Sequence, residues 1–119
     1  MKNRPPYRVL VIDDSAFIRQ FLTRIINQNQ DLKVIATAAD PIKAMEILKK
    51  TEVDVITLDI EMPNMDGLQF LKQLMHFRPL PVVMISSWTQ EDSEMAVQAL
   101  ALGAVDIIAK PTLGLRSGM

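Results

Sequence analysis

The sequence predicts an α/β fold, a doubly wound five-stranded parallel sheet with helices on both faces. Short β-branched runs alternate along the chain with segments whose apolar residues recur at helical spacing. Several of these runs end abruptly on an acid, a serine or a lysine, at the sheet edge where such folds bind ligands. The length of 119 residues is enough for one domain, and no repeat or linker divides it. We therefore expect one domain over residues 1–119.

The first half of the chain contains two strand–helix units. A strand at 9–12 is followed by Asp13, Asp14 and Ser15, and the serine is a suitable helix N-cap. The helix after it has apolar residues at three- and four-residue spacing, namely Phe17, Ile18, Phe21, Leu22, Ile25 and Ile26. Residues 32–38 form a second strand, and Asp40-Pro41 begins a second helix. We expect the buried face of that helix to consist of Ile42, Met45 and Leu48.

The second half continues the alternation with three more strands. Residues 53–59 form a strand buried on both faces, and Pro63, Asn64 and Gly67 place a loop after it. A helix follows, then a strand at 81–86, a helix at 92–102 that Gly103 ends at its C′ position, and a strand at 104–109. The apolar positions of the two helices are Leu68, Leu71, Leu74 and Met75, then Met95, Ala96, Ala99 and Leu100. Residues 113–119 are too few and too glycine-rich for a covering helix, so the last helix is expected to be truncated.

Composition excludes several classes of protein. The net charge is −1 and no Lys/Arg cluster stands out, which argues against nucleic-acid binding through bulk charge. The absence of cysteine excludes disulfides and cysteine-based metal sites. The polar start and the short first apolar run predict neither a signal peptide nor membrane insertion. We expect a soluble cytoplasmic domain.

Polar side chains gather where the predicted strands end. Asp13 and Asp14 follow the first strand, Asp59 ends the third, Ser86 ends the fourth and Lys110 follows the fifth. Carboxylates brought together at one edge raise one another's pKa unless a cation lies among them, and Mg²⁺ prefers such oxygen ligands. The lysine and the hydroxyl would then contact an incoming phosphate. These groups suit phosphoryl transfer onto a carboxylate.

Each feature also has an ordinary structural explanation. An acidic pair after a strand often serves only as a turn and a helix cap, and a lysine before a proline is often a solvated strand end. The apolar positions of the helix at 92–102 and the methionines at 45, 75 and 84 are most simply explained as core packing. The functional interpretation therefore depends on all the polar groups meeting at one edge.

Three segments resemble the signature of response-regulator receiver domains. They are Val11-Ile12-Asp13-Asp14-Ser15, Leu58-Asp59-Ile60-Glu61-Met62-Pro63 with Met65-Asp66-Gly67, and Ile108-Ala109-Lys110-Pro111. The resemblance implies a flavodoxin-like sheet of order 2-1-3-4-5 and assigns a role to each polar residue. Asp59 would be the phosphoacceptor, Asp14 a direct Mg²⁺ ligand, Asp13 a ligand through water and Glu61 a ligand through its backbone carbonyl. Lys110 would pair with the phosphoryl group, Ser86 would follow it on activation, and the Lys110-Pro111 bond would be cis.

A narrower resemblance is to the receivers of chemotaxis protein-glutamate methylesterases. It rests on the segments at 81–89 and 99–106 and on the tail at 110–119. It implies phosphorylation by a chemotaxis histidine kinase, which would relieve repression of a C-terminal methylesterase that demethylates and deamidates chemoreceptors. That domain is not in this chain: the only histidine, His76, lies near the end of a predicted helix, and the chain lacks the glycine pattern of a nucleophile elbow, so it cannot house an esterase triad. The parent protein would therefore be an enzyme, whereas this chain would only accept phosphate.

One position departs from the receiver pattern. Ile107 occupies a place where receivers often carry an aromatic residue that moves together with the hydroxyl at position 86. Switching would then involve residues 87–102, and Trp88, the sole tryptophan, would report it.

Three other functions stay open at this stage. A receiver that stands alone or has another output fits the same residues. A Mg²⁺-dependent aspartyl phosphohydrolase would use Glu61 as its general acid/base. An inert receiver-like module is disfavoured by the intact acids and lysine.

Overall fold

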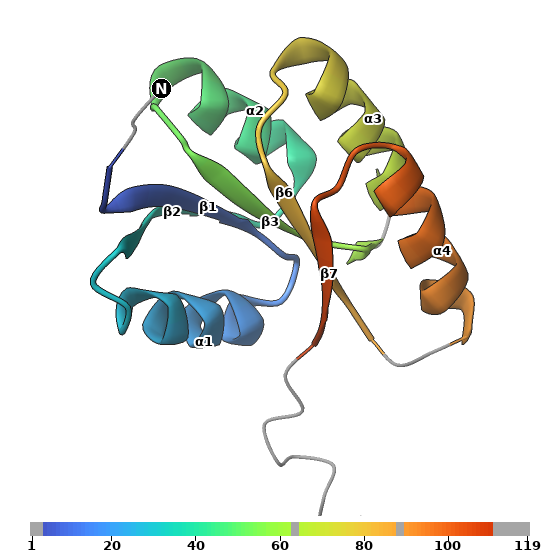
Figure 1. The fold of residues 1–119 in the computed structure, drawn as a ribbon, viewed down its shortest axis with the longest axis horizontal. Helices are drawn as coiled ribbons and strands as arrows, with labels where there is room; N and C mark the ends of the chain where they lie inside the picture. The colour runs from blue at the N-terminus through green and yellow to red at the C-terminus, as the bar shows by residue number, and fades with distance from the viewer. Residues whose placement is uncertain (1–3, 63–64, 88–89, 111–119) are drawn as a thin grey trace, which may run out of the picture.

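Strands and helices alternate along the chain in the computed structural model, which describes residues 4–62, 65–87 and 90–110. The elements are β1 (Tyr7–Ile12), α1 (Ala16–Asn27), β2 (Leu32–Ala38), α2 (Pro41–Lys50), β3 (Val55–Asp59), β4 (Glu61–Met62), β5 (Met65–Asp66), α3 (Gly67–Phe77), β6 (Val82–Ser86), α4 (Gln90–Ala101) and β7 (Asp106–Ala109). Five parallel strands form one sheet in the order β2-β1-β3-β6-β7, which confirms the predicted order of the five strands. Helix α1 lies on one face of the sheet, and α2, α3 and α4 lie on the other (Figure 1).

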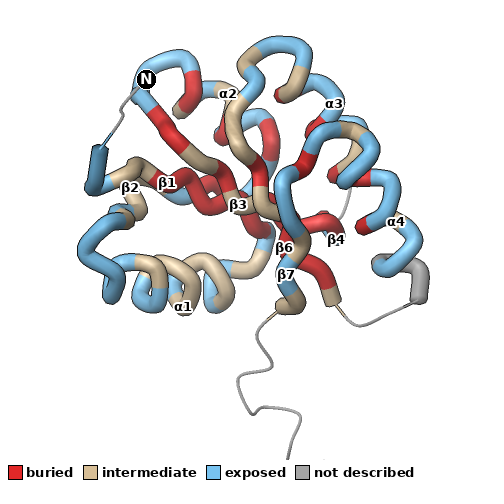
Figure 2. Tube along the Cα trace, in the orientation of Figure 1, coloured by how far each residue is buried: buried red, intermediate tan, exposed pale blue. Residues whose placement is uncertain are grey.

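The main core lies between the sheet and the three-helix layer. Because side chains alternate along a strand, Ile56 and Leu58 of β3 face that layer, and both are fully buried. Helices α2, α3 and α4 contribute Ala44, Leu48, Phe70, Leu71, Leu74, Ala96 and Ala99 to the same cluster. Figure 2 shows buried segments concentrated in the central strands and in the inner sides of these helices. Residues 9–12 of β1 are buried on both faces, whereas Val55 and Thr57 of β3 are half-buried on the face opposite this core, so the predicted burial of β3 on both faces is only partly correct.

Helix ends follow the signals in the sequence. The Ser15 hydroxyl accepts a hydrogen bond from the Ile18 N–H at 3.2 Å, and Asp40 caps α2 by accepting from the Lys43 N–H at 2.8 Å. Gly103, two residues beyond the last residue of α4, has a φ of 117°, a left-handed conformation that suits glycine. These three predicted helix ends are confirmed.

Two structural expectations were wrong. Ile42 lies outside the core with 74 % of its surface exposed, because Ala44 and Leu48 set the buried face of α2 and Ile42 is two residues from the first of them. The expected loop after Asp59 contains a short antiparallel hairpin of β4 and β5, and Asp66 caps α3 so that Gly67 is its first residue. The other elements begin or end within two residues of the expected positions.

The apolar side chains at 92–102 divide between two environments. Ala96 and Ala99 are buried and Met95 packs against the core, whereas Leu100 is 49 % exposed. The methionines at 45, 75 and 84 contact the core, as expected for filler side chains. Within the described residues, no helix is long and apolar enough to cross a membrane.

Candidate functional site

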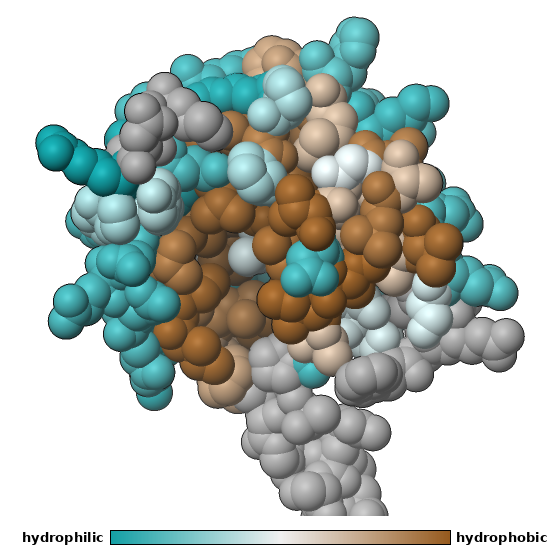
Figure 3. Space-filling view, in the orientation of Figure 1, coloured by the Kyte–Doolittle hydropathy of each residue, from teal (hydrophilic) through white to brown (hydrophobic). Residues whose placement is uncertain are grey.

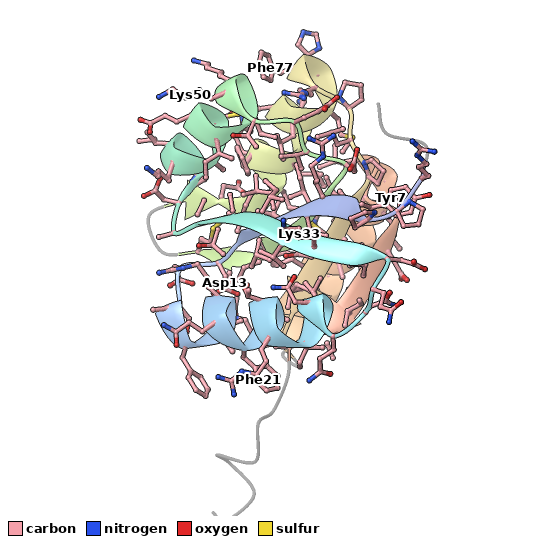
Figure 4. All side chains as sticks on the ribbon, turned by 90° about the vertical axis from the view of Figure 1, so that its left-hand side faces the viewer. Tyr7, Asp13, Phe21, Lys33, Lys50 and Phe77 are labelled. Carbon is pink, nitrogen blue, oxygen red and sulfur yellow. The ribbon has the colours of Figure 1, made fainter. Side chains whose placement is uncertain are left out.

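Four strands of the sheet end at the same edge, and they bring the predicted polar residues together. Asp13 follows β1, Asp59 is the last residue of β3, Ser86 is the last of β6 and Lys110 follows β7. Asp59 is fully buried and Asp13 is 1 % exposed, while Asp14 is exposed beside them. Figure 4 shows Asp13 at this edge, next to the start of α1. The structure thus places two carboxylates inside the protein and one at its surface.

The three carboxylates form a compact oxygen cluster. One oxygen from each of Asp13, Asp14 and Asp59 can be chosen so that all three lie within 4.8 Å of one another. Asp13 Oδ1 accepts from the Ser15 N–H at 2.8 Å, but Asp13 Oδ2 is buried and has no hydrogen-bond partner among the described residues. A buried acceptor without a partner is costly unless a ligand occupies its free side. This donor set fits a hard divalent cation such as Mg²⁺.

Lys110 supplies the positive charge of the site. Its Nζ lies 3.2 Å from Asp59 Oδ1 and 3.3 Å from Asp59 Oδ2, so it contacts both oxygens of the buried carboxylate. Asp59 Oδ1 also accepts a hydrogen bond from the Glu61 N–H at 3.0 Å. These contacts hold the Asp59 carboxylate between the Lys110 ammonium group and the Glu61 N–H.

Lys110 alone does not offset the cost of ionising the two buried carboxylates. Burial, together with the charge of Asp13, raises the pKa of Asp59 from 3.8 to about 7, although Lys110 and the Glu61 N–H oppose the shift. Burial is also the largest cause of the raised pKa of Asp13. Burial lowers the pKa of Lys110, but the negative charges of Asp59 and Asp13 outweigh that effect and raise it. A cation among the carboxylates would remove this conflict.

Arg19 belongs to the site, although the sequence analysis did not select it. Its Nη1 donates to the backbone carbonyl of Asp13 at 2.8 Å from one turn into α1. The contact holds the turn that carries the two acids, and the charge of Arg19 lowers the pKa of Asp13. An arginine four residues after an N-cap serine lies one helical turn from the end of the preceding strand. This spacing could have identified Arg19 from the sequence.

Ser86 lies at the edge but is not joined to Asp59 by a hydrogen bond. Its hydroxyl donates to the Ser87 carbonyl at 2.8 Å, and the residue is 6 % exposed. Ile107 pairs with Met84 and is partly buried against the main core. It occupies the position where the family resemblance led us to expect an aromatic residue. Trp88 and the Lys110-Pro111 bond lie outside the described residues.

The β4–β5 hairpin closes the site next to Asp59. Glu61 pairs with Asp66, and its exposed side chain contrasts with the buried Met62 that follows it. The backbone of Gly67 packs so closely on the residue before the hairpin that a Cβ there would lie 2.7 Å from the Ile60 carbonyl oxygen. This contact holds the segment that precedes Glu61, whose carbonyl is the candidate metal ligand.

Substituting Gly67 with alanine is therefore expected to displace the hairpin. A backbone oxygen cannot move aside as a flexible side chain can, so we expect a loss of about 1–3 kcal/mol in the free energy of unfolding. We also expect weaker Mg²⁺ binding, measured by calorimetry. Gly103→Ala is the matched control, since it strains a helix end without touching the hairpin. Equal Mg²⁺ affinity in both variants would show that the close packing at Gly67 does not shape the site.

The family model of the response regulator receiver domain matches residues 9–114. A protein-glutamate methylesterase/protein-glutamine glutaminase from Escherichia coli K12 is 55 % identical over 112 residues, which are 94 % of this chain and 32 % of that protein. The chain thus spans about a third of the length of the curated relatives it matches.

Solved structures give the same result. The response regulator domain of Thermotoga maritima CheB superposes with a TM-score of 0.79 at 47 % identity, over 89 % of this chain and 79 % of that chain. The structure of the P1 domain of CheA3 in complex with CheY6 from R. sphaeroides gives a TM-score of 0.78 at 36 % identity, over 94 % and 88 % of the two chains. With the family model covering most of the sequence and the fold shared, the chain belongs to the response regulator receiver domain family.

Proposed function

We propose that this chain is a phosphorylation-controlled receiver of a chemotaxis system, with Asp59 as the residue that accepts the phosphoryl group. The observation that carries the proposal is the setting of Asp59, which is fully buried, contacted on both oxygens by Lys110 and grouped with two further acids. A salt bridge that served only stability would not need Asp13 beside it, because the charge of Asp13 makes Asp59 harder to ionise.

Mg²⁺ is the proposed cofactor of the site. Asp14 and Asp59 would hold it directly, Asp13 through water, and Glu61 through its backbone carbonyl. The unpartnered Oδ2 of Asp13 and the clustered oxygens support this set. When bound, the cation would neutralise charge on the phosphoryl oxygens and on the acids.

The chemical step requires Asp59 in its ionised form. An oxygen of Asp59 attacks the phosphorus of a phosphohistidine donor, the new O–P bond forms as the P–N bond breaks, and the donor imidazole takes up a proton. Lys110, already 3.2 Å from Asp59, would follow the phosphoryl oxygens as negative charge builds on them. The residues here thus act by positioning and charge.

Activation would begin at Ser86. Its hydroxyl donates to the Ser87 carbonyl in this structure, and rotation toward a phosphoryl group would break that hydrogen bond and pull on the segment leading to α4. Val97 and Leu100 of α4 are 68 % and 49 % exposed, so they would be available to transmit this movement to a bound partner protein. Ile107 packs against the main core and has no aromatic ring, so the signal would pass through the segment from Ser87 to α4.

The output and partners follow from the relatives as part of the same proposal. The chain would act as the receiver of a chemotaxis protein-glutamate methylesterase, in which a further C-terminal domain demethylates and deamidates chemoreceptors. A chemotaxis histidine kinase would donate the phosphoryl group, and the CheY6 structure with a P1 domain of CheA3 supports a partner of that kind. The protein would work in the cytoplasm without inserting into the membrane or binding nucleic acid.

A titration with Mg²⁺ and then beryllium fluoride, a phosphoryl mimic, tests the proposal. We expect saturable, Mg²⁺-dependent binding that changes the fluorescence of Trp88, the sole tryptophan, and that is lost in Asp59→Ala. Calorimetry on the same samples separates binding from the optical signal. An unchanged response in Asp59→Ala would contradict the assignment, and steady turnover of a phosphomonoester would favour a phosphohydrolase instead.

Substituting Lys110 with methionine is expected to weaken beryllium fluoride binding by about 10–100-fold. The reason is the loss of one charge-assisted contact, worth about 1.5–3 kcal/mol. Mg²⁺ binding should not weaken, because the substitution removes a positive charge near the carboxylates. Lys33→Met, an exposed lysine on β2, is the matched control for calorimetry. If both variants bound the mimic equally, Lys110 would have no role in phosphoryl recognition.

A further inference from the structure

Helix α3 carries an open groove that involves none of the candidate site residues. The described residues that line it are Gln69, Lys72, Gln73, Met75 and His76, and its volume is about 490 Å³. Four of these residues are exposed, and Met75 is half-buried. Because all five belong to one helix, the groove runs along the helix surface and is not an enclosed cavity. This shape suits an extended segment of another protein better than an enclosed small molecule.

Met75 gives the groove an apolar floor. Its side chain packs against the main core. It also lies close to the end of α4, since a Cβ at Gly103 would be 3.3 Å from both Cγ and Sδ of Met75. Methionine is flexible and polarizable, and protein surfaces that bind varied partners use it often. The floor can therefore accept an apolar side chain of a bound segment.

The rim of the groove is basic. Lys72 and His76 line it, and no acid is found among the described residues that do so. Lys72 also takes no part in the ion pairs of the described residues. The amides of Gln69 and Gln73 add hydrogen-bond donors and acceptors that suit a peptide backbone. The groove thus combines an apolar floor with a positive, amide-rich rim.

The C-terminal ends of α2 and α3 extend this surface. They are joined by Arg78, whose Nη1 donates a hydrogen bond to the Leu48 carbonyl oxygen. Figure 4 shows Lys50 and Phe77 at the same edge of the molecule, and Phe77 is 52 % exposed. Figure 3 shows hydrophilic residues along the border formed by α2 and α3, with apolar residues among them.

The charge of this region differs in sign from that of the whole chain. The only acid on either helix is Glu46, which lies 3.9 Å from Lys43, and the chain has a net charge of −1. The basic residues of this region are Lys43, Lys49, Lys50, Lys72 and Arg78. Basic residues in a last helical turn compensate the helix dipole, but Lys72 lies in the middle of α3 and has no such role. A positive field of this kind favours an acidic partner.

We propose that the groove on α3 binds an acidic segment of a partner protein. An apolar side chain of that segment would lie on Met75, and its carboxylates would contact Lys72 and His76 at the rim. The proposal goes beyond phosphoryl acceptance, because none of these residues belongs to the Asp59 site.

NMR spectra of the full, ¹⁵N-labelled chain, titrated with a glutamate-rich peptide that contains one leucine, test the proposal. We expect saturable shifts concentrated at residues 69–77 and a dissociation constant that rises at least tenfold in Lys72→Glu. Lys33→Glu makes the same change of charge at an exposed position on β2 and should raise the constant less than twofold. Added salt, or serine in place of the peptide's leucine, should also weaken binding.

A second variant, Gln73→Glu, places a carboxylate in the groove with little change of shape and should also weaken binding. The spectrum of each variant establishes that it is folded, so a misfolded Lys72→Glu protein would not decide the result. Beryllium fluoride binding of both variants should equal that of the wild-type protein, which separates this question from that of phosphoryl acceptance.

Three results would overturn the proposal. The first is a titration without saturable shifts at α3. The second is an equal loss of affinity in Lys33→Glu and Lys72→Glu, since binding would then depend only on net charge. The third is binding of phosphatidylglycerol vesicles, but not of the peptide, through residues 69–77, because this surface would then contact a membrane.

Discussion

Substituting Asp59 with asparagine is expected to stabilise the metal-free protein at pH 8 by about 2 kcal/mol. Burial raises the pKa of Asp59 from 3.8 to about 7, and the charge of Asp13 adds to the shift. A pKa raised from 3.8 to about 7 corresponds to at most about 4 kcal/mol of destabilisation, and loss of the contact with Lys110 reduces the gain from the substitution. Asparagine keeps the shape of the side chain without the charge.

The pH dependence follows from the direction of that shift. Between pH about 4 and about 7, the folded protein holds a proton on Asp59 that the unfolded chain has released. The stability of the metal-free protein should therefore fall as pH rises through this interval, and the raised pKa of Asp13 acts in the same direction. Asp59→Asn should show a flatter profile in urea unfolding at a series of pH values.

Mg²⁺ provides the internal control for this prediction. Because the cation would favour the ionised carboxylates, its addition should stabilise the wild-type protein most at pH 8 and stabilise Asp59→Asn less. The exposed Asp31→Asn is the matched substitution and should change neither profile. A wild-type stability that increases with pH from 4 to 8 without Mg²⁺ would contradict the charge conflict described for the site.

Asp13→Asn is expected to weaken Mg²⁺ binding by about 10–100-fold, the usual effect of removing an outer ligand partner. Asp13 Oδ2 is buried and no described residue gives it a hydrogen bond, so it is the acceptor best placed to bind a water of the cation. Asparagine keeps an oxygen for the Ser15 N–H, so the turn should persist. Calorimetric titration measures the change.

Asp40→Asn is the control for this substitution. Asp40 is also an acid whose side chain accepts a backbone N–H, but it lies at the start of α2, away from the candidate site. Mg²⁺ affinity should be unchanged in that variant. If Asp13→Asn bound Mg²⁺ as tightly as the wild-type protein, the unpartnered oxygen would have no part in metal binding.

Much of the fold was predictable because each element carried its own local signals. The run before Asp59 is apolar and β-branched, as a strand of a covered parallel sheet requires, and Ser15, Asp40 and Gly103 mark helix ends through short-range hydrogen bonds or a single φ angle. The grouping of Asp13, Asp59 and Lys110 followed from topology, because strand ends in a parallel sheet share an edge.

What could not be predicted depended on contacts between elements. Ile42 lies three residues before Met45, as a buried position would, but the packing of Ala44 and Leu48 decided which side of α2 faces inward. The β4–β5 hairpin depends on the close approach of Gly67 to Ile60, which has no local sequence pattern.

The central claim is that Asp59 accepts a phosphoryl group, and intact-mass spectrometry tests it most directly. The chain would be incubated with Mg²⁺ and a small phosphoramidate donor, with Asp59→Ala and Asp31→Ala treated alongside. We predict that the wild-type protein and Asp31→Ala gain the mass of one phosphoryl group and that Asp59→Ala gains none. An equal gain in Asp59→Ala would contradict the assignment of Asp59 as the acceptor.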